Sequence, residues 1–499
     1  MSRSFVVHAA TLRGVEALPV ECEISCSGGI PGISLTGLPD GAIRESRLRV
    51  RCALSNRGYQ VPRLHFTVNL APAEVRKSGT GFDLPLAVGI LALTGQMSPC
   101  DIENCLFVGE LGLNGSVHAV RGMVAYQKLA RSLGLRLVCA PDAELGQGVE
   151  EGVLRVDDIG QLSCGIRFLT SLPPSSQGAR GHREASPALD FADVIDQEAA
   201  KRALTIAATG GHGLLMVGPP GAGKTMLARR LPSILPPLTE REREEAMLVN
   251  SVAGQGVEEI VAGIRPFRAP HHSVSLAGLI GGGRPVVPGE ISLAHKGVLF
   301  LDELPEFATN VLQALRQPFE ERVVRIVRVD GVYSFPCDFT FVAAANPCPC
   351  GHLGDTGHEC RCTQAMVDNY QSHIGGPLMD RIDMQLFVAR PAGSEVIGGR
   401  RGMSSAEMRE AVERGRAFAA WRASREGDAT ESEAEVARQG LSAEASSLLE
   451  GMSARFAMGG RSIVRVARVA RTIADLDERE RVSADDIRES CSYRDRGER

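Results

Sequence analysis

A glycine-rich stretch near the middle of the chain constrains the fold most strongly. Residues 218–225 read Gly-Pro-Pro-Gly-Ala-Gly-Lys-Thr, which is the G-x-x-x-x-G-K-[ST] pattern of a phosphate-binding loop. A short apolar run, residues 214–217, precedes the loop, and apolar residues at helical spacing follow it (Met226, Leu227 and Leu231). The pattern therefore predicts a buried strand, a loop and a helix, the context in which backbone N–H groups surround a phosphate.

Two side chains of this loop have expected roles of their own. Lys224 would reach the β- and γ-phosphates of a nucleoside triphosphate, and the Thr225 hydroxyl would hold Mg²⁺. A chance glycine-rich turn before a helix is the alternative interpretation, and the complete motif with its flanks argues against it. We therefore predict a nucleotide site whose loop consists of Gly218, Pro219, Pro220, Gly221, Ala222, Gly223, Lys224 and Thr225.

Two further apolar runs end in polar side chains that suit the same chemistry. Residues 297–301 lead into Asp302 and Glu303, and two acids after a buried strand are costly unless a cation meets them. We expect Asp302 to complete the Mg²⁺ shell and Glu303 to orient and deprotonate the attacking water. Taken alone, the run would be a strand ending in solvent-exposed acids. A third run, residues 339–345, ends at Asn346, which would position the water opposite the γ-phosphate.

Arginines late in the chain are candidate contacts to the same phosphates. Arg381 follows a Gly-Pro turn, and it is either a surface ion-pair partner or, in an ATPase, an arginine finger that reaches into a neighbouring subunit. Arg461, Arg465 and Arg468 fall at positions i, i+4 and i+7, so they share one helix face, which is either solvated or functional. We interpret Arg461 as a sensor-2 residue that folds over bound phosphates. The roles of Arg465 and Arg468 stay open, and DNA is one candidate partner for them.

Four cysteines within fifteen residues form a candidate Zn²⁺ site: Cys348, Cys350, Cys360 and Cys362. Their C-x-C pairs differ from the usual C-x-x-C knuckle, and such close spacing strains a shared tetrahedral site. His352 and His358 lie in the same stretch and could replace a thiolate ligand. Without a metal, the four would be reduced cysteines of a loop, so both interpretations stay open.

Composition limits the environment of the protein. The chain has 499 residues, 43% of them apolar, which is enough for about three domains with cores of their own. Its net charge of −5 excludes a generally basic nucleic-acid binder, so any such surface must be local. Residues 1–8 do not resemble a signal peptide, and no apolar run is long enough to cross a bilayer. Because thirteen cysteines, an odd number, also favour a reducing compartment, we predict a cytoplasmic protein without a membrane partner.

Changes in pattern divide the chain into four parts. Residues 1–170 contain half-buried strands, Gly-rich turns and two helical patterns, as an α+β unit does. Residues 171–188 are rich in Pro, Gly and Ser and predict a linker. Residues 189–395 contain the nucleotide motifs and predict an α/β ATPase domain, whereas residues 396–499 predict a helical C-terminal domain.

The N-terminal part resembles the amino-terminal domain of magnesium-chelatase-like proteins, which shares its fold with the Lon protease domain and ribosomal protein S5. The matching segments are residues 79–87 and 107–117. By this resemblance, Asp83 and Val124 take the places of the Ser and Lys that Lon-type proteolysis requires, and neither can do that nucleophilic chemistry. We therefore expect a non-proteolytic scaffold or a DNA-facing module.

Two stretches between the motifs are candidates for contact with DNA. Residues 322–335 predict a hairpin whose arginines alternate with apolar residues, and its cationic face is either solvated or grips a phosphodiester backbone. His271 and His272 lie in residues 265–275; because they are adjacent, they would not face one metal together, and we expect them to be structural or DNA-facing. Between these stretches, residues 307–319 predict one amphipathic helix.

Together, the motifs resemble the magnesium-chelatase-like AAA+ ATPases, specifically the ComM (YifB-type) competence-protein family. Residues 190–197 are similar to the segment that lines the adenine pocket in AAA+ ATPases, although that family usually has Gly where Asp196 lies. The resemblance covers nearly the whole chain. Besides the phosphate loop and the acidic strand end, it is carried by residues 266–273, 288–295, 346–351 and 376–383.

This resemblance implies an AAA+ P-loop ATPase domain with a Lon-protease/S5-like N-terminal domain and a C-terminal helical lid, in a bacterial, cytoplasmic hexamer that uses ATP and Mg²⁺. It further implies a branch-migration helicase on single-stranded or branched DNA, acting in recombination and natural transformation. The alternatives are a magnesium-chelatase subunit, an ATP-dependent protease and an ATP-gated scaffold for a protein partner. Residues 1–170 argue against the chelatase, so we expect no porphyrin, and Asp83 argues against the protease.

Overall fold

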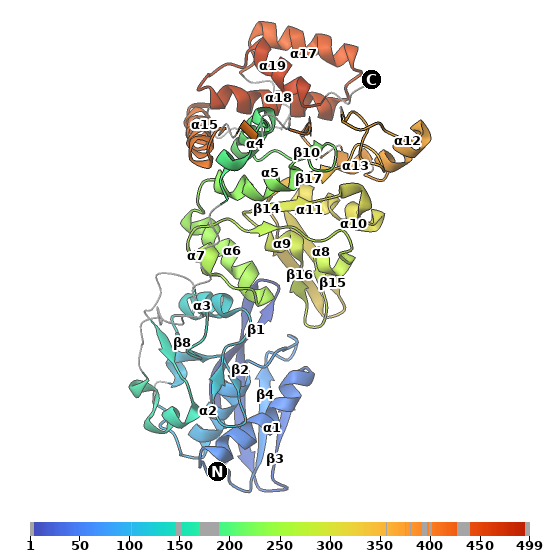
Figure 1. The fold of residues 1–499 in the computed structure, drawn as a ribbon. Coiled ribbons are helices and arrows are strands. Elements are labelled where there is room, and N and C mark those ends of the chain that lie inside the picture. Colours follow the sequence, from blue (N-terminus) through green and yellow to red (C-terminus); the bar gives the residue numbers. More distant parts are fainter. Residues whose placement is uncertain are drawn as a thin grey trace.

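The chain forms three units that follow one another along the long axis of the molecule (Figure 1). The N-terminal sheet unit and the C-terminal helices lie at opposite ends, with the parallel-sheet unit between them. The expected linker, residues 171–188, lies outside the described residues. The computed structural model describes residues 4–100, 102–145, 152–169, 189–355, 357–374, 376–379, 381–391, 397–398, 402–426 and 440–494.

A seven-stranded mixed sheet organises the N-terminal unit, in the strand order β3-β4-β2-β1-β5-β8-β9. Its buried residues alternate along the strands, so one face packs against α1 and α2 while the other packs against α3. Its strands are Ser4–Arg13 (β1), Glu16–Ser27 (β2), Gly32–Thr36 (β3), His65–Ala71 (β4), Cys105–Phe107 (β5), Arg136–Cys139 (β8) and Val153–Arg155 (β9). Glu110–Leu111 (β6) and Val117–His118 (β7) form a separate antiparallel pair. The helices are Gly41–Asn56 (α1), Asp83–Leu93 (α2) and Met123–Ser132 (α3).

Five parallel strands form the sheet of the central unit, in the order β11-β14-β17-β10-β18. Successive residues of β10 belong to separate cores on the two faces, Leu214 and Met216 to one and Leu215 to the other, as in a parallel sheet covered on both sides. The strands are Leu214–Val217 (β10), Phe267–Arg268 (β11), Val298–Leu301 (β14), Thr340–Ala345 (β17) and Met384–Phe387 (β18). The expected mixed α/β class with a parallel sheet is therefore confirmed.

Helices and two small hairpins complete the central unit. β12 and β13 form one antiparallel pair, and β15 and β16 form the hairpin that the sequence predicts, with Arg328 opposite Gly331 at its tip. The helices are Glu198–Gly210 (α4), Lys224–Arg230 (α5), Glu240–Ala253 (α6), Glu258–Val261 (α7), Leu276–Ile280 (α8), Glu290–Leu293 (α9), Gln364–Ser372 (α12) and Gly376–Met379 (α13). The hairpin strands are Gly281–Gly282 (β12), Val287–Pro288 (β13), Val323–Arg328 (β15) and Gly331–Pro336 (β16).

The single helix predicted over residues 307–319 is wrong. Two short helices occupy this stretch, Thr309–Ala314 (α10) and Arg316–Glu321 (α11). Pro318 explains the break, because a proline lacks an N–H group and its ring clashes with the carbonyl four residues earlier in a continuous helix. In α11, Pro318 lies in the first turn, where a helix tolerates proline.

Four helices form the C-terminal unit: Ser405–Glu426 (α15), Ala443–Arg455 (α17), Gly460–Leu476 (α18) and Ala484–Ser492 (α19). α15 and α18 pack against α4 of the central unit, which joins the two units through an apolar core (Figure 1). Val469 and Ile473 of α18 contribute to that core, whereas Val466 and Ala470 pack toward α17 and α19. The apolar spacing of α18 thus gives it two buried faces.

The N-terminal and central units contact each other directly. Helix α3 packs on α6, where Val124 joins a small apolar cluster with Ala246 and Met247. The Gly122 amide donates to the carbonyl of Ser251 at 2.8 Å, and the loop at Gly14 approaches the backbone of Ser334 in the β15–β16 hairpin. At the hairpin tip, Asp330 lies 3.8 Å from Arg76, so the hairpin is held beside the N-terminal unit.

Candidate nucleotide site

The phosphate loop is formed in the structure between β10 and α5. Gly221 and Gly223 have φ values of +78° and +89°, a left-handed conformation that side chains disfavour. A Cβ at Gly218 would lie 2.1 Å from the carbonyl oxygen of Val388, so only glycine fits beside strand β18. The glycines of the motif are thus required by the backbone path itself, and the loop leads directly into the N-terminus of α5.

Lys224 is buried at the centre of this loop. Its Nζ donates to the carbonyl oxygens of Gly218 at 2.6 Å and Pro219 at 3.0 Å. Burial lowers the pKa of Lys224, and the nearby Asp302 and Glu303 partly offset that effect. A polyphosphate bound in the loop would bring further negative charge to this buried cation, so the residues present fit a nucleoside triphosphate.

The polar ends of the neighbouring strands converge on this loop. The Thr225 hydroxyl donates to Asp302 Oδ2 at 2.6 Å, and Lys224 Nζ donates to Asn346 Oδ1 at 3.2 Å. This meeting follows from the sheet order, since β14 and β17 lie on the same side of β10 and parallel strands end at one edge. Thr225 and Asp302 thereby supply two oxygen ligands at one place, which fits the coordination that Mg²⁺ prefers.

Glu303 follows Asp302 in a backbone conformation unusual for its type. Its φ is +52°, in the left-handed region, and its side chain is half-exposed. His272 Nδ1 lies 3.2 Å from Glu303 Oε2. The sequence predicts different roles for the two residues, and no spacing rule links residues so far apart in the chain.

The backbone conformation of Asp196 explains why this residue is tolerated in the segment expected at the adenine pocket. Asp196 has a φ of +56°, the backbone region in which glycine is at ease and Asp is among the better-tolerated alternatives. The next residue, Gln197, donates to the carbonyl oxygen of Ala389 at 2.8 Å. Asp196 therefore adopts a backbone conformation that glycine would also adopt.

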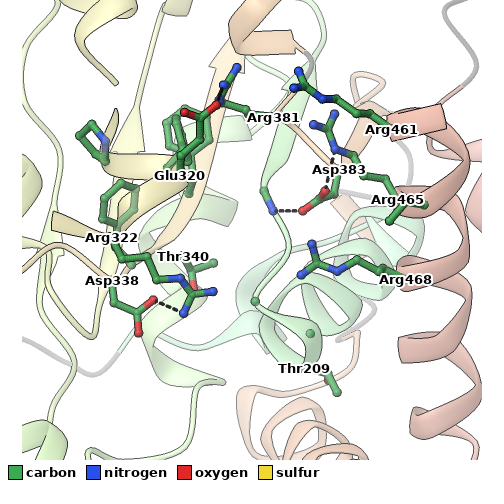
Figure 2. Close-up of a pocket in the computed structure, with 18 of the residues that line it drawn as sticks. Thr209, Glu320, Arg322, Asp338, Thr340, Arg381, Asp383, Arg461, Arg465 and Arg468 are labelled. Atoms are coloured by element: carbon green, nitrogen blue, oxygen red, sulfur yellow. Dashed lines mark hydrogen bonds and ion pairs between the residues drawn. The ribbon is translucent and has the colours of Figure 1, made fainter. Parts of the chain in front are cut away.

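A second site lies at the opposite edge of the same sheet. A cavity of about 1100 Å³ opens at the edge where β10, β14 and β17 begin, and Gly213, Gly297 and Phe339, the residues before these strands, line it. Arginines from distant parts of the chain line it, as Figure 2 shows for several of them. They are Arg265, Arg322, Arg381, Arg416, Arg461, Arg465 and Arg468.

The structure places Arg461 in this cavity. The residues that line the cavity include Arg381 and Arg461 and none of residues 218–225. Contact of Arg461 with phosphates bound to its own chain stays a prediction. Arg465 lies 3.6 Å from Asp383 in this cavity, so the arginine face of α18 is turned toward the central unit, although Arg461 is still exposed to solvent (Figure 2).

Arg381 belongs to the same cationic cluster. It pairs with Glu320 of α11. Burial lowers the pKa of the Arg381 guanidinium, and repulsion from Arg316, Arg461 and Arg465 lowers it further. Carboxylates of the same cavity pair with four of its arginines, in the pairs Arg265–Glu242, Arg322–Asp338, Arg381–Glu320 and Arg465–Asp383. Phosphate groups of a partner would compete with these carboxylates for the arginines.

The four cysteines of the candidate zinc site come together in the loop after β17. Their Sγ atoms lie within 4.8 Å of one another, and the Sγ–Sγ distances are 3.4 Å for Cys348–Cys350 and 3.6 Å from Cys360 to each of these. Sulfur ligands about 2.3 Å from a tetrahedral zinc ion are about 3.8 Å apart. The C-x-C pairs therefore reach one shared site, and the residues fit Zn²⁺.

The two nearby histidines form a separate group. His352 and His358 both approach Asp355 Oδ2, at 3.3 Å and 3.4 Å, and their rings stack on each other. Arg390 lies 3.4 Å from the same carboxylate and donates to the carbonyl oxygen of Pro220 at 3.0 Å. This arginine, which the sequence analysis did not single out, connects the cysteine loop to the phosphate loop.

The comparisons with known proteins cover the parts that contain these sites. The family model for magnesium chelatase, subunit ChlI, matches residues 190–396. The model for subunit ChlI of Mg-chelatase matches residues 21–144, and that for its C-terminal part matches residues 402–494.

Relatives extend this match to nearly the full length. The competence protein ComM of Haemophilus influenzae is 39% identical over 98% of this chain and 97% of its own length, and YifB of Escherichia coli is 38% identical over 98% and 96%. The chain belongs to the magnesium-chelatase-like family of ComM and YifB. By contrast, the magnesium-chelatase 67 kDa subunit of Heliobacterium mobile is 28% identical over 40% of this chain and 33% of its own length.

In this ComM/YifB-family chain, the residue at the position expected for a protease nucleophile is buried and hydrogen-bonded. Asp83 is buried and accepts from Arg49 at 2.6 Å and 2.9 Å and from the Leu111 amide at 3.1 Å. Val124 packs in the contact with the central unit. Lys77 is also buried and donates to the carbonyl oxygen of Pro72.

The structure also bears on the expected environment of the chain. Among the residues that the structure describes, no helix has both the length and the apolar character needed to cross a bilayer. The thirteen cysteines form no disulfide in the described part of the chain, which contains all of them.

The cysteine loop leads to a testable prediction. Purified protein is expected to contain about one zinc ion per chain, and Cys360→Ser is expected to lose it and to hydrolyse ATP more slowly, because Gly351 of this loop packs against Pro220 of the phosphate loop. Cys52→Ser, at an exposed thiol of α1, is the control and should keep its metal. Metal analysis that finds no zinc, with all four thiols alkylated in the native protein, would contradict the zinc site.

Proposed function

We propose that the chain is an ATP-driven motor on DNA that works as a ring of six copies. One observation carries the proposal: the residues for hydrolysis lie at one edge of the sheet, and the arginine cavity lies at the other. Among the described residues, Arg390 contacts the phosphate loop at Pro220, whereas Arg381 and Arg461 line the cavity at the other edge of the sheet. In a ring, the arginine edge of one copy would meet the phosphate edge of the next, and each interface would form a complete site.

Each residue of that composite site has a role. Bound ATP with Mg²⁺ supplies the phosphoanhydride bond that is cleaved. Lys224 would bind its phosphates, while Thr225 and Asp302 would hold the metal ion. Glu303 would accept a proton from the attacking water, and Asn346 would orient that water.

The arginines would complete the site from the neighbouring copy. Arg381 would act as the arginine finger, after exchanging Glu320 for the γ-phosphate of the adjacent chain. Arg461, next to it in the cavity, would contact the same phosphates in trans instead of those of its own chain. The pairing of Arg381 with Glu320 supports this role, since it keeps the cation in place until a stronger anion arrives.

DNA is the proposed substrate because of the β15–β16 hairpin and the name of one relative. The hairpin presents the exposed Arg325 and Arg328 together with exposed apolar side chains at Val327 and Val329. Cations that reach the backbone, with apolar groups that reach unstacked bases, suit a single strand. The competence protein ComM of Haemophilus influenzae supports a role in DNA uptake and recombination, in which the motor would drive branch migration.

The other units have proposed roles around this motor. The N-terminal unit would be a scaffold with a Lon-protease/S5-like fold and no protease activity, because Asp83 is held by Arg49. The C-terminal helices would form the lid domain. A magnesium-chelatase-type subunit or an ATP-gated scaffold for a protein partner is the alternative, favoured only by the partial match to the chelatase subunit.

The hairpin gives the experiment for the DNA proposal. Replacing Arg325 and Arg328 together by Ala is expected to weaken binding to a labelled single strand and to reduce the slope of log affinity against log salt by about 0.7 for each lost phosphate contact. The matched control replaces Arg425 and Arg488, two exposed arginines of the C-terminal helices. Equal affinities and slopes for both double variants would contradict a role of the hairpin in DNA binding.

A further inference from the structure

Helix α1 of the N-terminal unit carries a concentration of arginines that the rest of the chain does not explain. Residues 41–63, which comprise α1 and the turn after it, contain six arginines and a single acid, Glu45, in a chain whose net charge is −5. The stretch contains no lysine, and the planar guanidinium of arginine matches the oxygens of a phosphate better than an ammonium group does. Residues 41–63 therefore form a local basic surface in a chain that is acidic as a whole.

Two of these arginines hold the helix on its own unit. Arg49 donates to the buried Asp83 at 2.6 Å and 2.9 Å, and Glu45 lies 4.0 Å from the same guanidinium. Arg57, which follows the last turn of α1, pairs with Asp158. These contacts fix the inner side of α1 and leave its outer side to other arginines.

Arg44, Arg47 and Arg51 form the outer side, which we call the α1 arginine face. They are exposed and fall at positions i, i+3 and i+7, with Leu48 between them. In the described part of the chain, none of the three pairs with a carboxylate, and Arg47 Nε donates to the carbonyl oxygen of Arg44 at 2.8 Å. Since a helix rises by about 1.5 Å per residue, the three arginines present a row of positive charge about 10 Å long to the solvent.

Duplex DNA is the partner that this face fits best. Successive phosphates of one strand of B-DNA are about 3.4 Å apart along the helix axis, so a row of about 10 Å can contact several of them. The face has no aromatic side chain on which unstacked bases could stack, which argues against a single strand. Leu48 alone among the large apolar residues of α1 is exposed, which is too little apolar surface to insert into a membrane.

We propose that the α1 arginine face binds the phosphodiester backbone of duplex DNA. On branched DNA, the N-terminal unit would then hold a duplex arm while the β15–β16 hairpin takes a single strand. The three arginines would contact phosphates and read no base sequence. This inference rests on the proposed function, since it takes DNA as the substrate, and it adds substrate binding to the scaffold role of the N-terminal unit.

Binding of a labelled blunt-ended duplex to the full chain, measured by fluorescence anisotropy at several salt concentrations, tests this surface. The triple variant Arg44→Ala, Arg47→Ala and Arg51→Ala is expected to bind at least about tenfold more weakly at about 0.1 M salt, with a slope of log affinity against log salt that is smaller by about 0.9 for each lost phosphate contact. Alanine favours the helix, so α1 should remain folded. Lysine at the same three positions keeps the charge and should restore most of the affinity and of the slope.

A matched control removes three exposed arginines from another helix. Arg409, Arg414 and Arg425 lie on α15, which belongs to the helical unit at the opposite end of the molecule (Figure 1). Their replacement by Ala changes the net charge by the same amount and should leave duplex affinity near that of the wild type. An equal loss in both triple variants would overturn the inference, because it would show a general effect of net charge.

The other outcomes separate this surface from the motor. Wild-type affinity for the duplex in the α1 triple alanine variant would overturn the inference, and a simultaneous loss of binding to vesicles of anionic phospholipid would identify a membrane surface as the partner instead. The binding assay contains no nucleotide, so its result does not depend on hydrolysis. ATP hydrolysis that ignores DNA would count against the motor even if the α1 arginine face binds the duplex, whereas stimulation by DNA together with an unchanged triple variant would keep the motor and reject this surface.

Discussion

Glu303→Gln is expected to bind ATP but to hydrolyse it on the order of 10² times more slowly, or worse, because the amide cannot take the proton of the attacking water. The substitution keeps the size of the side chain, so nucleotide affinity should stay close to that of the wild type. Lys224→Ala, in contrast, is expected to lose ATP binding itself, since it removes the buried cation at the centre of the phosphate loop. Equilibrium binding of a fluorescent ATP analogue, combined with a phosphate-release assay, distinguishes the two.

The two variants test two separate assignments, the catalytic base and the phosphate site. If Glu303→Gln turned over ATP at the wild-type rate, Glu303 would not be the base. If Lys224→Ala kept wild-type affinity for ATP, the loop at residues 218–225 would not be the phosphate site. Lys201→Ala is no suitable control, because Lys201 is buried in α4. Lys128, which lies in α3 of the N-terminal unit, provides the matched lysine substitution.

Arg381→Ala is expected to reduce ATP turnover by ~10³-fold or more, the effect of removing an arginine finger, while leaving ATP binding intact. Because the arginine would act on the neighbouring copy, mixing two inactive variants should restore activity. In rings that contain both Arg381→Ala and Lys224→Ala, some interfaces combine an intact phosphate loop with an intact Arg381. Phosphate release from such mixtures is the measurement.

A second mixture controls for the first. Arg381→Ala combined with a chain that carries both substitutions has no complete interface, and it should remain inactive at every ratio. Equal activity of the two mixtures, or no recovery in the first, would contradict the action of Arg381 in trans. Arg461→Ala should follow the pattern of Arg381→Ala in these mixtures, because the two arginines share one cavity.

Local patterns were sufficient to predict the strands that hold the site. The apolar runs before Gly218, Asp302 and Asn346 are strands β10, β14 and β17, and the arginine-rich stretch is the β15–β16 hairpin. These elements are set by neighbours in the chain, namely by apolar content and turn residues. The break between the two short helices at 309–321 could also have been predicted from the sequence, because a proline at position 318 interrupts a continuous helix.

Contacts between distant parts of the chain could not be predicted in this way. The meeting of Arg322, Arg381 and Arg461 depends on how α18 packs on α4, and no spacing within one segment encodes it. The same holds for His272 with Glu303 and for Arg390 with Pro220. The arginine spacing of α18 correctly identified one face, but only the packing shows that this face turns toward a cavity at the edge away from the phosphate loop.

ATP hydrolysis by the purified wild-type chain, measured without DNA, with single-stranded DNA and with a branched DNA junction, tests the central claim most directly. The account predicts that DNA accelerates hydrolysis and that both the basal and the stimulated rates disappear in Lys224→Ala. A rate that is the same with every form of DNA would contradict the motor and would favour a protein partner as the substrate of this ATPase.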